Sequence, residues 1–97
     1  MNIDIKDMIT LSDKIDYIVV SKAIYMEDIY YFLIDKSMKN VKFCKEKTGT
    51  DILIEIEASK INNELLNLFL INSKKSMTEE ELKKIDEFMV KFKNERI

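Results

Sequence analysis

The stretch DIYYFLID, residues 28–35, decides the fold of this 97-residue chain. Its central residues, 29–34, are all apolar or aromatic, whereas a strand with one solvated face alternates apolar and polar side chains. The stretch therefore predicts a central β-strand that is covered on both faces. We expect the sheet's own curl to cover one face and the C-terminal helices to cover the other.

Strand-like runs lie on both sides of this central strand. β-Branched and aromatic residues predict further strands at 8–11, 17–25, 41–46 and 51–58. Because the connections between them are short, we expect sequential antiparallel pairing. The sequence thus predicts an α+β fold in which residues 8–58 form a five-stranded antiparallel β-meander, open to curling into a small SH3-like half-barrel.

Two helices are predicted after the strands, within a single domain of residues 1–97. Ser59 is the expected N-cap of a helix over 59–73, whose apolar residues occupy most of its circumference and predict burial on several sides. An amphipathic helix over 78–95 begins at MTEEEL, where Thr78 and Glu81 have the spacing of a capping box. Its apolar stripe consists of Leu82, Ile85, Phe88, Met89 and Phe92.

The composition argues against an enzyme and against cofactor binding. The chain has no histidine, so the usual near-neutral general base is missing. With Gly49 as its only glycine, it cannot form a phosphate-binding loop or a dinucleotide-binding fingerprint. We therefore expect a non-enzymatic protein with no cofactor, no metal site and no small-molecule substrate.

The same sequence indicates a cytoplasmic protein of a bacterial cell or of a phage-infected host. No run of residues is apolar over the length of a membrane span, and the acidic N-terminus does not resemble a signal peptide. The single cysteine, Cys44, cannot form an internal disulfide, which fits a reducing compartment.

The tyrosines and their apolar neighbours are the candidate partner-binding residues, because tyrosine is enriched at protein interfaces. They are Tyr17, Tyr25, Tyr30, Phe32 and Ile34. The opposite register of the central strand would instead expose Ile29, Tyr31 and Leu33. In either register, cover by the helices is the alternative explanation for the apolar face.

A second candidate site is a cluster of basic residues, which could contact a phosphate backbone or line a solvated sheet edge. Its members are Lys36, Lys39, Lys42, Lys45 and Lys47. On a strand, Lys42 points away from Lys45 and Lys47. Only one of the 16 basic residues is an arginine, so nucleic-acid binding is disfavoured.

Cys44 and the paired carboxylates give weaker signals. Neighbouring lysines could lower the pKa of the Cys44 thiol, but a free cysteine usually behaves as a small apolar side chain. Glu55 with Glu57, and the three glutamates at 79–81, could hold a divalent cation. Their spacing is more typical of a solvated strand face and of a helix start.

The layout of residues 8–71 resembles short uncharacterised domains of low-GC Gram-positive bacteria and their phages. The residues that carry the resemblance are ITLSDKIDYIVVSKAIYMEDIYYFLID, then VKFC, then DILIEIEASKINNELLNLF. The resemblance implies a small β-rich domain of unknown function and no active-site residue. The helix over 78–95 lies outside it.

We therefore expect a small protein-binding module that acts through protein–protein contacts and forms a homodimer. One alternative is a phage or mobile-element inhibitor of a host nuclease or defence system, similar to an anti-CRISPR protein. A weak nucleic-acid binder that uses the lysines at 36–47 is another.

Overall fold

Five strands pair in sequence order into one antiparallel sheet in the computed structural model, which describes residues 3–37, 40–47, 50, 52–75 and 77–95. For residues 88, 89 and 91–95 it describes the backbone only. The strands are β1 (Met8–Thr10), β2 (Asp16–Tyr25), β3 (Asp28–Asp35), β4 (Val41–Glu46) and β5 (Leu53–Ile56).

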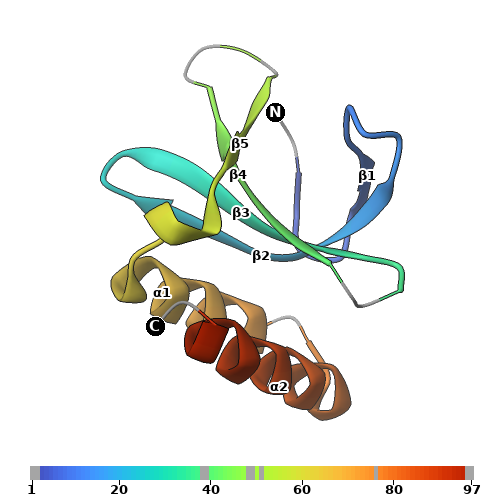
Figure 1. Ribbon diagram of the computed structural model, residues 1–97, viewed down its shortest axis with the longest axis vertical. Helices are drawn as coiled ribbons and strands as arrows, with labels where there is room; N and C mark the ends of the chain where they lie inside the picture. Colours follow the sequence, from blue (N-terminus) through green and yellow to red (C-terminus); the bar gives the residue numbers. More distant parts are fainter. Residues whose placement is uncertain (1–2, 38–39, 48–49, 51, 76, 96–97) are drawn as a thin grey trace.

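The sheet curls into a half-barrel with the two helices outside it (Figure 1). The N-terminal segment lies on the concave side, and α1 (Asn63–Lys74) and α2 (Glu79–Glu95) lie on the convex side. The predicted α+β fold, a curled five-stranded meander followed by two helices, is confirmed. The last strand is shorter than predicted, at Leu53–Ile56 within the expected range 51–58.

β3 coincides with DIYYFLID, and its two faces contribute to two separate cores. Phe32 and Ile34 pack on the convex side with residues of α1. Tyr31 and Leu33 pack on the concave side. Since successive side chains of a strand point to opposite faces, the even-numbered residues of β3 face the helices and the odd-numbered residues face the concave side.

A bulge in β2 brings the sheet and α1 together. Val19 pairs with Leu33 and Ser21 pairs with Phe32, so Val20 is an extra residue in β2. Such a bulge bends the strand and redirects its side chains. Val19 packs in the concave core, Val20 packs in the convex core, and the Ser21 hydroxyl donates a hydrogen bond to the carbonyl oxygen of Phe69 in α1.

α1 begins later than the sequence predicts. The N-cap is Asn62, whose side chain accepts a hydrogen bond of 2.8 Å from the Leu65 N–H. Ser59 instead lies in a 3₁₀ turn, η1 (Ala58–Lys60), in which the Ile61 N–H bonds to the Ala58 carbonyl oxygen. The prediction of Ser59 as the cap is therefore wrong, because this turn separates it from the helix.

α1 buries most of its apolar side chains, as predicted, but not Ile71. Leu65, Leu66 and Phe69 are buried in the convex core, together with Ile85 of α2, and Leu68 and Leu70 are partly buried against it. Ile71 has 53% of its surface exposed, so the expectation of burial on several sides is wrong for this residue.

α2 begins with the predicted capping box. The Glu81 N–H donates to the Thr78 hydroxyl oxygen at 3.2 Å, and the Thr78 N–H donates to the Glu81 carboxylate at 3.1 Å. In the apolar stripe, Ile85 is buried and Leu82 is half-buried, and the side chains at 88, 89 and 92 lie outside those described. Among the described residues, no helix is long and apolar enough to cross a membrane.

Candidate functional site

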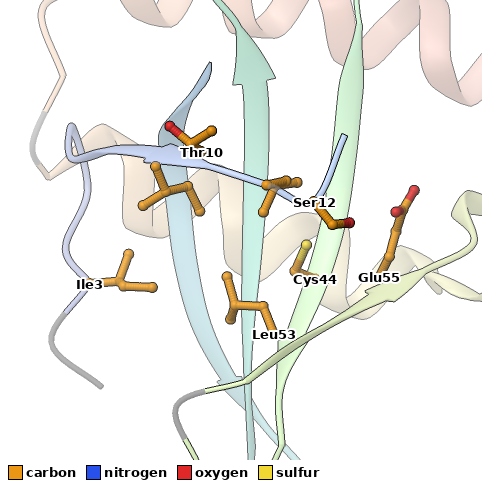
Figure 2. A pocket seen from close by; sticks show the side chains of 8 residues that line it. Ile3, Thr10, Ser12, Cys44, Leu53 and Glu55 are labelled. Carbon is orange, nitrogen blue, oxygen red and sulfur yellow. The ribbon is translucent and has the colours of Figure 1, made fainter. Parts of the chain in front are cut away.

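A pocket of about 380 Å³ opens on the concave face of the sheet, between residues of β1 and residues of β5 (Figure 2). Three parts of the chain line it: the N-terminal segment, the region of β1 and the following turn, and strands β4 and β5. The lining residues are Ile3, Ile9, Thr10, Leu11, Ser12, Cys44, Leu53 and Glu55. We call this site the concave pocket.

Backbone hydrogen bonds hold the N-terminal wall of the concave pocket in place. The Lys6 N–H donates to the Val19 carbonyl oxygen at 2.7 Å, and the Val19 N–H donates to the Asp7 carbonyl oxygen at 2.8 Å. The Lys22 ammonium donates to the carbonyl oxygen of Ile3 at 3.1 Å. These bonds fix Ile3, which packs in the concave core with only 9% of its surface exposed.

A chain of polar contacts ties the turn after β1 to strands β4 and β5. Lys42 of β4 places its Nζ 2.8 Å from the Glu55 Oε1 and 3.5 Å from the Asp13 Oδ2. The Tyr17 hydroxyl donates to the same Asp13 carboxylate at 2.8 Å. Lys42 therefore bridges the two sides of the half-barrel beside the concave pocket.

Cys44 lies at the floor of the concave pocket and is held as a neutral thiol. Only 1% of its surface is exposed, and burial, with a smaller contribution from Glu55, raises the pKa of the thiol to about 11. A thiol is a weak nucleophile until it loses its proton. This shift is opposite to the lowering that the neighbouring lysines suggested from the sequence.

Tyr31 closes the concave core beside the pocket. Its hydroxyl donates to the Glu46 carboxylate at 3.0 Å, and the Lys22 ammonium lies 5.8 Å from the centre of its ring. Burial, and then the bond to Glu46, raises the pKa of the Tyr31 hydroxyl well above its usual range. The side chain is therefore fixed and uncharged.

The concave pocket is suited to binding an apolar group. Isoleucine and leucine side chains supply much of its lining, and hydroxyls and one carboxylate supply polar groups. Among the described residues, no three histidine, cysteine or acidic side chains are arranged to hold a metal ion. A mainly apolar pocket with a few polar groups is the usual form of a binding site.

Most of the predicted partner-binding residues are inaccessible. Tyr17, Phe32 and Ile34 each expose 2% of their surface or less. Phe32 and Ile34 lie under α1, and Tyr17 lies in the concave core. These three side chains are not accessible to a partner in this structure, because the protein's own cores cover both faces of the sheet.

Tyr25 and Tyr30 are the two predicted partner-binding residues that keep some exposure. Both are half-buried against the convex core, with their ring centres 6.4 Å apart. The Tyr25 hydroxyl donates to the Glu64 carboxylate at 3.1 Å and accepts from the Asn62 amide at 3.0 Å. Tyr25 therefore joins β2 to the start of α1.

The predicted basic cluster does not form one continuous positive surface. Three of its lysines contact carboxylates: Lys36 contacts Asp16 at 3.5 Å, Lys45 contacts Asp28 at 3.6 Å, and Lys42 lies in the bridge already described. Lys47 is exposed. Lys39 lies outside the described residues. The carboxylates partly offset the charge that a phosphate backbone would require.

The sequence did not point to the concave pocket, because its lining residues are far apart along the chain. Ile3, Leu11 and Leu53 belong to no common motif and meet only through the curl of the sheet. One available signal was Leu53, an apolar residue on the strand face that otherwise carries Glu55 and Glu57.

Comparisons with protein-family models, with curated proteins and with solved structures find no match to this chain. The resemblance to short domains of low-GC Gram-positive bacteria thus stays a prediction.

Proposed function

We propose that this protein is a non-enzymatic protein-binding module whose concave pocket receives an apolar side chain of a partner protein. The observation that carries the proposal is the combination of an apolar lining with polar groups from Thr10, Ser12 and Glu55. The apolar lining would bury the side chain of the partner. The polar groups would bond to the backbone beside that side chain.

The charges beside the pocket indicate which partner it favours. Asp13 and Glu55 carry two negative charges, and Lys42 between them carries one positive charge, which leaves one net negative charge. A partner segment with a large apolar residue next to a lysine or arginine would complement this charge.

The protonation states of Cys44 and Asp13 favour binding over catalysis. The Cys44 thiol is neutral at physiological pH, and the pKa of Asp13 is lowered by the Ile15 N–H, the Tyr17 hydroxyl and Lys42. Asp13 therefore stays ionised and is a poor proton donor. A general acid near neutral pH needs a raised pKa instead.

The walls of the concave pocket are also ordered before any partner binds. The hydrogen bonds of Lys6 and Val19 fix one wall, and the Lys42 bridge fixes another. A site that is already ordered loses less conformational entropy on binding, which favours useful affinity from a small contact.

A peptide-display library of random heptamers tests the proposal, with Ser12→Trp as the variant that fills the pocket. Ser12 is exposed at the pocket, so a large ring there should occupy the site without disturbing the core. Ser59→Trp is the matched control, because Ser59 is also exposed and lies in η1, outside the pocket lining.

The protein should enrich peptides that carry a large apolar residue beside a basic one. Binding of those peptides should weaken at least tenfold in Ser12→Trp and stay unchanged in Ser59→Trp. If no peptide is enriched, or if both variants bind the enriched peptides equally, the concave pocket is not a protein-binding site.

A further inference from the structure

The outer edge of β5 carries exposed isoleucine side chains. Among the described residues, β5 is the last strand and pairs only with β4. Ile52, just before the strand, has 55% of its surface exposed, and Ile54 has 39% exposed. Ile52, Ile54 and Ile56 occupy alternate positions, so their side chains lie on one face of the strand. This is the convex face, because Ile56 packs against the convex core.

The other edges are protected against pairing with a further strand. β2 extends beyond its short pairing with β1. In this part of β2, the Lys22 carbonyl oxygen accepts a hydrogen bond of 2.7 Å from the Asn72 side chain of α1. β1 itself has only three residues. Short strands, covering helices and lysines are the usual means of protecting an edge. Leu53–Ile56 has no lysine, proline or bulge.

Some backbone hydrogen-bonding groups of β5 also point outward, away from β4. The Lys47 N–H bonds to the Ile52 carbonyl oxygen, which turns the peptide groups of Ile52 toward β4. In an antiparallel pair, successive residues direct their peptide groups alternately toward and away from the partner strand. Leu53 and Glu55 therefore present their N–H and C=O groups at the outer edge.

We propose that two copies of this protein pair through β5, antiparallel, about a twofold axis that passes beside Ile54. Leu53 of one copy then lies opposite Glu55 of the second copy, and the two residues exchange hydrogen bonds. Ile54 lies opposite Ile54 of the second copy, and Ile52 lies opposite Ile56 of the second copy. The isoleucines of both copies form one apolar stripe across the axis, which is the self-complementarity that a twofold contact requires.

Charge and the isoleucine stripe select this register over its neighbours. An axis at Glu55 would place two glutamates directly opposite each other, and an axis at Leu53 would place Ile56 opposite Thr50 of the second copy instead of opposite an isoleucine. Like charges directly opposite each other destabilise a sheet. The axis at Ile54 places no like charges opposite each other within Leu53–Ile56.

The dimer is of the weak, reversible class. A contact built on four residues of each strand is smaller than the roughly 1,200 Å² of total surface that stable interfaces bury. The axis is perpendicular to the sheet, so both concave pockets face the same side. A partner with two copies of its binding segment would then gain from binding both pockets. The proposal rests on the β5 edge and holds whatever the concave pocket binds.

Disulfide trapping tests the register directly. In this pairing the two Ile54 residues form a non-hydrogen-bonded pair with Cα atoms ~4.5 Å apart, which is within the range of a disulfide. The test variant is Ile54→Cys in a Cys44→Ala background. The matched control is Ile71→Cys in the same background, because Ile71 is an exposed isoleucine on α1 rather than β5.

Under mild oxidation, Ile54→Cys should form a covalent dimer at least tenfold faster than Ile71→Cys. Equal rates would overturn the proposal. Sedimentation equilibrium gives a second measurement without cysteine: Ile54→Lys should weaken self-association at least tenfold, and Ile71→Lys should leave it unchanged. A wild-type protein that sediments as a monomer at concentrations on the order of 1 mM would also overturn the proposal.

Discussion

The Ser21 hydroxyl donates a hydrogen bond of 2.6 Å to the carbonyl oxygen of Phe69, and this contact joins the bulge of β2 to the middle of α1. Both residues are fully buried. The bulge is what turns Ser21 toward the helix, since the extra residue Val20 changes the alternation of side chains along β2. A local irregularity of the sheet thus fixes where α1 lies.

Removing this hydroxyl should weaken the attachment of α1. Ser21→Ala is expected to lower the free energy of unfolding by about 1 kcal/mol, the usual net value of a buried hydrogen bond. Urea denaturation measures the change. Ser59→Ala is the control, since Ser59 is exposed and such a change is usually within ~0.5 kcal/mol of neutral. Equal stability of the two variants would contradict a role for the Ser21 contact.

The β2–β3 hairpin has a turn that its residues do not favour. Met26 and Glu27 are the two residues between the strands, and they have φ angles of 49° and 71°. Two central residues with positive φ are typical of a type I′ turn, for which Asn-Gly is the preferred sequence. Replacing Met26-Glu27 by Asn-Gly should therefore raise the free energy of unfolding by about 1 kcal/mol.

Thermal and urea unfolding check the turn prediction, with Glu27→Ala as the control. Alanine keeps the Cβ that opposes positive φ, so this variant should show no gain in stability. A gain in Glu27→Ala as large as that of Asn-Gly would mean that loss of the glutamate side chain, rather than relief of backbone strain, is the cause.

The Cys44 thiol should be nearly unreactive in the folded protein. Its pKa of about 11 is two units above the ordinary 9.0, so at pH 8 the thiolate fraction is about a hundredfold lower than in the unfolded chain. Its burial lowers the reaction rate further. The rate of reaction with a disulfide reagent such as dithionitrobenzoate, with and without urea, measures the ratio. A ratio near one would show that Cys44 is not held in this core.

The sheet was predictable because the signals that specify it are local. DIYYFLID is β3 from its first residue to its last, and the capping box of Thr78 and Glu81 forms as the spacing predicted. Each depends on residues close together in the sequence. The start of α1 was missed because both Ser59 and Asn62 are good caps, and only η1 decides between them.

The candidate site was much less predictable, because it depends on how the sheet curls. The alternation of residues in β3 predicts that the strand has two faces, but it does not predict which elements of the protein cover each face. Ile3, Leu11 and Leu53 line one pocket only because the curl brings β1 toward β5 (Figure 1). The pairing of Lys42 with Asp13 and Glu55 depends on the same curl. The pattern of β3 therefore predicted the strand, but Phe32 and Ile34, two of its expected partner-binding residues, are buried.

The Asp13 carboxylate should make the stability of the protein depend on pH in the acid range. The Ile15 N–H, the Tyr17 hydroxyl and Lys42 hold the pKa of Asp13 below its usual 3.8. Because the folded pKa is the lower one, the stabilisation is fully present above pH 3.8 and is lost as the pH falls through the folded value. Asp13→Asn should therefore be less stable than the wild type at pH 7, and the difference should shrink as the pH falls below 3.8.

Urea denaturation between pH 7 and pH 2 measures this difference. Asp86→Asn, an exposed aspartate on α2, is the control and should stay close to the wild type throughout. Asp16 and Glu81 keep part of the acid dependence in both variants, because hydrogen bonds from Thr10 and Thr78 also lower their pKa values. If the difference in free energy of unfolding between Asp13→Asn and the wild type were constant over this range, the charge of Asp13 would not contribute to stability. The contacts of Asp13 to Tyr17 and Lys42 would then stabilise the turn without its ionisation.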